Sequence, residues 1–92
     1  MLIVSYDISN DKVRTKFAKF LKKFGRKIQY SVYEIKNSPR IINNITIEIE
    51  KTYKNKFSNA DSILIVPITE ADEHKIIRYG YPALEEEELL FL

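Results

Sequence analysis

The sequence predicts an α+β domain with the element order β-α-β-β-α-β and an extra strand at the C-terminal end. Two observations predict this class. Short segments rich in β-branched and aromatic residues alternate in polarity or are apolar throughout, as is typical of strands. Between them, apolar residues recur at the three- and four-residue spacing of helices that bury one face. The 92 residues suit one domain, which we place over residues 1–92.

The first two elements are a strand and a helix. Residues 2–8 (LIVSYDI) are β-branched and aromatic and predict a strand. Ser9, Asn10 and Asp11 are residue types that commonly begin a helix. Gly25 lies where the glycine after a helix end is expected. The apolar stripe of this helix consists of Val13, Phe17, Phe20, Leu21 and Phe24.

The next elements follow the same criteria. Residues 28–35 alternate in polarity and predict one strand. Ser38 and Pro39 predict the start of a second helix, with proline in its first position. Residues 47–50 also alternate, so that the segment up to Tyr53 fits either a helix or a strand. The remaining predicted strands are residues 61–68, a short one at 75–79 and the apolar end at 89–92.

The predicted order β-α-β-β-α-β is that of the ferredoxin-like fold, in which both helices cover one face of the sheet. We expect the first strand and the strand at 61–68 to be central. Because side chains alternate between faces, Asp7 then lies on the helix-free face with Gln29, Ser31 and Tyr33. The strand at 61–68 is apolar on both sides, so its helix-free face needs a cover. A second copy of the chain is the simplest cover, and the sequence therefore predicts a homodimer.

Charge is divided unevenly along the chain. Residues 1–56 hold 13 basic and 5 acidic residues, a net charge of +8, and residues 57–92 hold 2 basic and 8 acidic residues, a net charge of −6. One side of the first helix carries four lysines that have no acid one turn away: Lys12, Lys16, Lys19 and Lys23. They extend over ~16 Å of helix, enough to follow several backbone phosphates. We expect a nucleic-acid-binding surface here, although exposed helices that bind nothing also carry lysines.

Asp7 is the candidate metal ligand. It ends the first strand, and in a symmetric dimer it would approach its own copy. Two carboxylates ~4 Å apart repel by roughly 4 kcal/mol at an effective dielectric of 20. A Mg²⁺ ion, which binds one or two carboxylates together with waters and phosphates, would relieve that repulsion. The alternative is that Asp7 only stabilises the start of the following helix.

Composition excludes several other classes. The chain has no cysteine, which excludes disulfides and cysteine-based zinc sites. No segment approaches the ~18 apolar residues of a membrane span, and we expect a cytoplasmic protein without a membrane partner. An RNA-recognition module shares the element order but stacks bases on aromatic residues of its central strands. The strand at 61–68 has no aromatic residue.

Several segments resemble the CRISPR-associated endoribonuclease family, the small second Cas protein of the spacer-acquisition complex. The matching segments are residues 6–9 (YDIS), 14–16 (RTK), 24–34 (FGRKIQYSVYE), 63–69 (ILIVPIT) and Gly80. The resemblance covers nearly the whole chain and is most specific over residues 24–34.

The resemblance implies a ferredoxin-like homodimer in which residues from about 86 to 92 add a strand to the partner's sheet. It implies one Mg²⁺ ion shared at the dimer interface through Asp7, and catalytic roles for Tyr6, Asp7 and Arg14. The implied partners are the Cas integrase of the adaptation complex and double-stranded protospacer DNA, or single-stranded RNA.

The predicted nucleic-acid-binding set also includes Arg14, Arg26 and Lys27. The resemblance matches Lys27 to a basic position of the family and Tyr33 to an aromatic one. Lys16 and Lys27 stand where the family often has arginine, and lysine lacks the bidentate fork that clamps a phosphate. The implied function is CRISPR adaptation in antiviral defence, by binding duplex DNA and bridging integrase dimers, with Mg-dependent endonuclease activity. One acidic ligand per chain predicts slow cleavage or none. The alternative is an RNA-binding ferredoxin-like module without catalysis.

Overall fold

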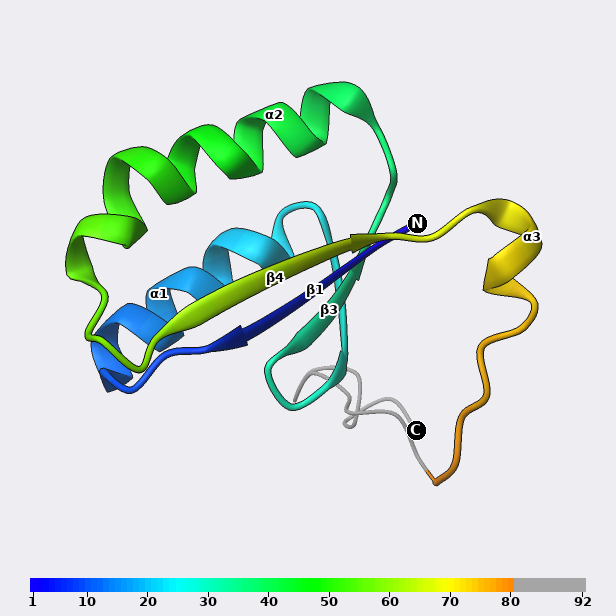
Figure 1. Ribbon diagram of the computed structural model, residues 1–92, viewed down its shortest axis with the longest axis horizontal. Helices are drawn as coiled ribbons and strands as arrows, with labels where there is room; N and C mark the ends of the chain where they lie inside the picture. Colours follow the sequence, from blue (N-terminus) through cyan, green and yellow to red (C-terminus); the bar gives the residue numbers. More distant parts are fainter. Residues whose placement is uncertain (81–92) are drawn as a thin grey trace.

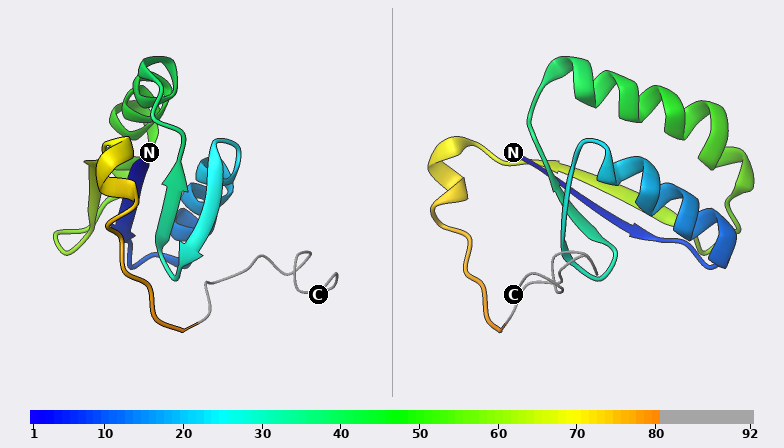
Figure 2. Two further views of the ribbon diagram at one scale, coloured as in Figure 1. Left: turned by 90° about the vertical axis from the view of Figure 1, so that its right-hand side faces the viewer. Right: turned by 180° about the vertical axis from the view of Figure 1, so that it is seen from behind.

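A computed structural model describes residues 1–80 and shows one four-stranded antiparallel sheet in the order β2-β3-β1-β4. The left view in Figure 2 shows the strands side by side in this order. The elements are β1 (Leu2–Asp7), α1 (Asp11–Lys22), β2 (Gly25–Gln29), β3 (Val32–Ile35), α2 (Pro39–Glu48), a π-helical turn η1 (Ile49–Tyr53), a 3₁₀ turn η2 (Lys54–Lys56), β4 (Ser62–Pro67) and α3 (Glu70–Glu73). The predicted ferredoxin-like order β-α-β-β-α-β is confirmed.

The two long helices lie on the same face of the sheet (Figure 1). α1 begins as predicted, because the side chain of Asn10 accepts a hydrogen bond from the Val13 amide at 3.0 Å. α2 begins with Pro39 in its first turn. Residues 47–50, which fitted a helix or a strand, are helical and continue into η1. The core between the helices and the sheet consists of Leu2, Val4, Tyr6, Ile8, Phe17, Leu21, Tyr33, Ile35, Ile45 and Tyr53.

The strand predicted over residues 28–35 is wrong, because the chain reverses within it. Tyr30 and Ser31 form a turn between β2 and β3, and Ser31 has a φ of 62° in the left-handed region. The reversal changes which residues face the helices. Tyr33 is 2% exposed and belongs to the core, so that it does not share the helix-free face with Asp7. Tyr30, on the turn, is 74% exposed.

Three further sequence predictions are corrected. The strand at 61–68 lies at an edge of the sheet as β4, and β3 takes the central place beside β1. Residues 76–79, the greater part of the short strand predicted at 75–79, form no strand, and no strand of the described chain pairs with them. Gly25 does not end α1 in a left-handed conformation but begins β2. A Cβ there would lie 2.0 Å from the Glu34 carbonyl oxygen, so a close approach of two strands requires this glycine.

The helix-free face of the sheet is partly apolar. Alternation along β1 buries Val4 and Tyr6 under the helices and leaves Asp7 on the other face, as predicted. The strand register places Leu64 and Val66 of β4 on that same face, and Leu64 is 61% exposed. The strand expected at residues 86–92 lies outside the described residues. Within residues 1–80, no helix is both long and apolar enough to cross a membrane.

Candidate metal site and nucleic-acid interface

Asp7 is the last residue of β1 and is exposed. Its register partner across the sheet is Ser62 of β4. The carboxylate makes no hydrogen bond or ion pair with any other residue in the range 1–80. Its oxygen lone pairs are therefore available to a ligand that approaches the helix-free face.

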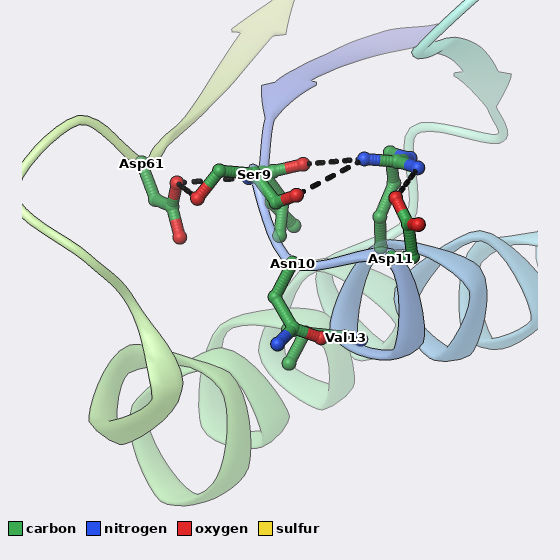
Figure 3. A network of polar contacts seen from close by, with 7 residues as sticks. Ser9, Asn10, Asp11, Val13 and Asp61 are labelled. Atoms are coloured by element: carbon green, nitrogen blue, oxygen red, sulfur yellow. Dashed lines mark hydrogen bonds and ion pairs between the residues drawn. The ribbon is translucent and has the colours of Figure 1, made fainter.

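The loop after Asp7 is held by Asp61, which directly precedes β4 (Figure 3). The Ser9 amide and the Ser9 hydroxyl both donate to Asp61 Oδ1 at 2.9 Å. The amide of Ser58 donates to Asp61 Oδ2, and its hydroxyl to Oδ1, both at 3.0 Å. The backbone amides of Ser58 and Ser9, joined by the two hydroxyls, lower the pKa of Asp61 from 3.8 to about 2. Asp61 is thus a charged acceptor that links two loops.

Arg14 contacts the same loop from α1. Its Nη1 donates to the Ile8 carbonyl at 3.0 Å and to the Ser9 carbonyl at 3.4 Å, and its Nη2 pairs with Asp11 (Figure 3). The hydrogen bond that Arg14 donates to the Asp11 carboxylate raises the pKa of Arg14 above its ordinary value. The predicted catalytic residue Arg14 therefore lies beside the segment that follows Asp7, with its guanidinium bonded to the protein's own backbone.

Tyr6 lies on the opposite face of the sheet from Asp7, although the two are neighbours in the chain. Its ring is 7% exposed, meets Phe17 edge-on with centroids 5.2 Å apart, and stacks near Tyr33 at 6.4 Å. The predicted roles of Tyr6 in catalysis and of Tyr33 as a family-matched aromatic stay predictions. The structure places both rings in the core between the sheet and the helices.

The lysines predicted to bind nucleic acid are all exposed on α1 and at its end, and none is paired with an acid of residues 1–80: Lys12, Lys16, Lys19 and Lys23. The first three line a shallow groove of about 370 Å³ together with Asp11 and Thr15. Charge left unpaired in this way attracts a polyanion, and the acid of this groove, Asp11, is itself paired with Arg14.

Arg26 and Lys27 of β2 differ from those lysines, because each already has a partner. Arg26 Nε pairs with Glu34 Oε1 at 2.7 Å, and Arg78 reaches the other Glu34 oxygen at 3.3 Å. Burial raises the pKa of Glu34, but the hydrogen bonds from the two arginines outweigh it, so that the pKa is lowered. Lys27 Nζ lies 5.2 Å from the centroid of the Tyr30 ring, a cation–π contact.

Comparison with known proteins identifies the family. The family described as "CRISPR associated protein Cas2" matches residues 1–76. The chain belongs to the Cas2 family. It is 30% identical over 84 residues to "CRISPR-associated endoribonuclease Cas2 3" of Synechocystis sp., covering 91% of this chain and 88% of the relative. It is 29% identical over 79 residues to "CRISPR-associated endoribonuclease Cas2 2" of Methanospirillum hungatei, covering 86% and 84%.

Solved structures share the fold. The chain superposes on Streptococcus pyogenes Cas2 with a TM-score of 0.70 at 21% identity, covering 86% of this chain and 98% of that one. A hypothetical protein of Thermus thermophilus matches with a TM-score of 0.73 at 25% identity, covering 90% and 93%. The predicted family is therefore confirmed, and membership in the Cas2 family gives the chain a CRISPR-associated function.

The sequence and its resemblance predict a Mg²⁺ site at Asp7. The side chains near Asp7 show which ligands this chain could offer to that ion. Among residues 1–80, no three acidic, histidine or cysteine side chains gather to hold a metal. Of the acids near the end of β1, Asp11 is bonded to Arg14 and Asp61 to two serines, whereas Asp7 has no partner in the described part of the chain. Mg²⁺ commonly takes one or two protein carboxylates and completes its shell with waters and phosphates. Asp7 fits one such ligand, and within residues 1–80 it is the acid at the end of β1 whose carboxylate is not already bonded.

Sequence reasoning missed Asp61 and its serine partners. From the sequence, Ser9 is a candidate for a helix start and Asp61 for the beginning of a strand, and neither position indicates the contact between them. No spacing connects them, because they are 52 residues apart and meet only where β4 lies beside β1.

Proposed function

We propose that this chain is a spacer-acquisition protein of CRISPR antiviral defence that binds duplex DNA as a homodimer and bridges dimers of the Cas integrase. Family membership supports the setting. The observation that carries the binding mode is the row of four exposed lysines on one side of α1 and at its end, none of them paired with an acid of residues 1–80. This surface is part of a regular helix, so its charges keep a fixed spacing along a bound backbone.

The dimer is supported by the helix-free face of the sheet. Its register brings Ile3, Val66 and Leu64 together, and Val32 of β3 lies opposite Ser5 on the same side. A partly apolar sheet face gains by being covered. A second copy placed there would also bring two copies of Asp7 to the same interface.

The helix-free face of β1 and β3 has no aromatic side chains, which favours binding of duplex DNA over the stacking of single-stranded bases. Modules that recognise single-stranded RNA stack bases on aromatic side chains of the central strands. In β1 and β3 the residues that face away from the helices are Ile3, Ser5, Asp7, Val32 and Glu34, none of them aromatic. The alternative of an RNA-binding module without catalysis therefore requires recognition through the backbone, on the same lysines.

Charge reversal on α1 tests the proposal. We expect the variant Lys16→Glu/Lys19→Glu/Lys23→Glu to lose most of its affinity for duplex DNA. The slope of log affinity against log salt should fall by up to about 2.7, which is about 0.9 for each of three lost phosphate contacts.

A matched control reverses the same number of charges elsewhere. Lys51→Glu/Lys54→Glu/Lys56→Glu alters exposed lysines of η1 and η2. We expect it to keep most of the affinity and the slope. Equal losses in both triple variants would show that only net charge matters and would reject a binding site on α1. Repeating the titration with single-stranded RNA of equal length measures the RNA alternative directly.

We further propose that Asp7 of each copy holds one shared Mg²⁺ ion. When bound, Mg²⁺ would supply positive charge to neutralise a phosphate at the dimer axis. Asp7 contributes a carboxylate that has no partner within residues 1–80, and the loop that follows it is fixed by Arg14 and Asp61.

The experiment compares wild type with Asp7→Asn, prepared identically, for metal-dependent cleavage of RNA and DNA and for spacer integration with the partner integrase. If Asp7→Asn loses cleavage but keeps spacer integration, the protein has nuclease activity that depends on Asp7 and that adaptation does not require. Equal cleavage by both preparations would indicate a contaminating nuclease and reject Asp7 as a catalytic ligand.

A further inference from the structure

The hydrogen bonds at the end of β1 assign a role to an acid outside the metal site. We propose that Asp61 is a positioning residue that fixes the backbone of Asp7 through Ser9. The inference rests on the proposed function, because it concerns how Asp7 is held for a cation. Asp61 binds both the amide and the hydroxyl of Ser9, two residues beyond Asp7, at 2.9 Å.

The position of Asp61 explains why this contact acts on Asp7. The last register pair between β1 and β4 joins Asp7 to Ser62. Asp61 directly precedes Ser62, and its side chain bonds Ser9 just past the end of β1. The side-chain bond therefore extends the connection between the two strands beyond their last backbone pair. It adds to the burial of Ile8 and to the Arg14–Ile8 hydrogen bond, which also hold the chain just after Asp7.

The Ser9 residue is held from two directions. Its amide donates to Asp61 at 2.9 Å, and its carbonyl accepts from Arg14 Nη1 at 3.4 Å. Arg14 also binds the Ile8 carbonyl at 3.0 Å (Figure 3). The segment between Asp7 and α1 is thus held by the Asp61 carboxylate, which precedes β4, and by the Arg14 guanidinium of α1. Removing the acid takes away the bond to the Ser9 amide and leaves the carbonyl bonds from Arg14, the buried Ile8 side chain and the 3.3 Å contact between the Ser9 and Ser58 hydroxyls.

Asp61 is suited to this role and not to holding the ion. Its Oδ1 accepts from Ser9 and from the Ser58 hydroxyl, and its Oδ2 accepts from the Ser58 amide. Its acceptor positions are largely occupied, whereas the carboxylate of Asp7 has no partner in residues 1–80. A ligand held by surrounding hydrogen bonds binds a metal more tightly, since less order is lost on binding.

The test uses full-length protein and Mn²⁺ alone, a paramagnetic substitute that also prefers carboxylate oxygens. Binding is measured by electron paramagnetic resonance for wild type, Asp61→Asn, Asp61→Ala, Ser9→Ala and Asp7→Asn. Asp72→Asn is the matched control, because Asp72 is an exposed acid paired with Lys75, beyond the far end of β4. Backbone amide exchange and chemical shifts of Asp7, Ser9 and Asn10 are recorded on the same samples.

We expect Asp61→Asn to weaken Mn²⁺ binding about tenfold, the lower end of the loss on removing a supporting group around a metal ligand. Asp61→Ala should weaken it further, since Asn keeps one acceptor oxygen. Ser9→Ala should lie between wild type and Asp61→Asn, because it removes one of the two bonds to Asp61. Asp72→Asn should bind as wild type does. Amide exchange at Ser9 should be faster in both Asp61 variants.

Two results would overturn the inference or separate it from the proposed metal site. If Asp7→Asn abolishes Mn²⁺ binding but Asp61→Asn and Asp61→Ala bind like wild type, Asp61 does not position Asp7. If wild type and Asp7→Asn bind Mn²⁺ equally, the proposed metal site is rejected and the amide data decide. If the amide exchange and chemical shifts of Asp7 and Ser9 are then the same in Asp61→Ala as in wild type, the positioning role is overturned. If they differ, the role is supported.

Discussion

The hydroxyl of Tyr53 donates a hydrogen bond to the backbone carbonyl of Lys16 at 3.3 Å, which joins the π-helical turn η1 to the middle of α1. The Tyr53 ring is 2% exposed and meets Phe17 edge-on with centroids 4.9 Å apart. Burial, and then the carboxylate of Glu48, raise the pKa of Tyr53 above its ordinary value. The helix that carries the lysines is thereby fixed to the chain that follows α2.

The first prediction concerns this bond. Tyr53→Phe keeps the ring packing and removes the hydroxyl. The free energy of unfolding should therefore fall by about 1 kcal/mol, the usual net contribution of one hydrogen bond to stability. Tyr79→Phe is the matched control, because Tyr79 is 91% exposed, and it should change stability by less than about 0.5 kcal/mol. Urea unfolding of the three proteins measures both values. Equal stabilities for wild type and Tyr53→Phe would mean that the hydroxyl contributes nothing.

The second prediction separates two reasons for glycine. In Gly25→Ala the new Cβ would meet the Glu34 carbonyl oxygen at 2.0 Å, so the β2–β3 pairing must shift, at a cost of about 3 kcal/mol. At Gly80 nothing lies within 4 Å, but φ is +76°, so Gly80→Ala should cost only about 1 kcal/mol. Thermal unfolding gives the two costs. Amide exchange should show lost protection in β2 only for Gly25→Ala, and protection that survives there would contradict the steric account.

Much of the fold could be predicted from local patterns. β1 and β4 are β-branched segments, and α1 has both an apolar stripe and a capping asparagine. The hairpin could not be predicted, because Ser31 adopts the left-handed turn conformation without the glycine or asparagine that normally indicates it. Alternation that seemed continuous through the turn then assigned Tyr33 to the wrong face. Alternation assigns residues to the two faces of a sheet only as long as they belong to one uninterrupted strand.

The candidate site could be predicted only in part, for the same reason. Asp7 lies on the predicted face because it belongs to one uninterrupted strand, and the lysines of α1 follow a regular helical spacing. The link between Ser9 and Asp61 depends on β4 lying beside β1, which is a property of the sheet and not of either segment. Side-chain contacts between distant loops leave no periodic pattern in the sequence.

The third prediction is a pH dependence of stability that comes from Asp61. The folded pKa is about 2 and the ordinary value is 3.8, so between these values the unfolded chain binds more protons and stability rises with pH. The contribution of Asp61 is fully present above pH 3.8 and is lost as the pH falls through about 2. The difference in unfolding free energy between wild type and Asp61→Asn should therefore be constant at pH 5 to 7 and shrink steadily toward pH 2. Denaturant titrations across this range measure it, with Asp72→Asn as the control. A difference that does not vary with pH would show that Asp61 acts through shape rather than charge.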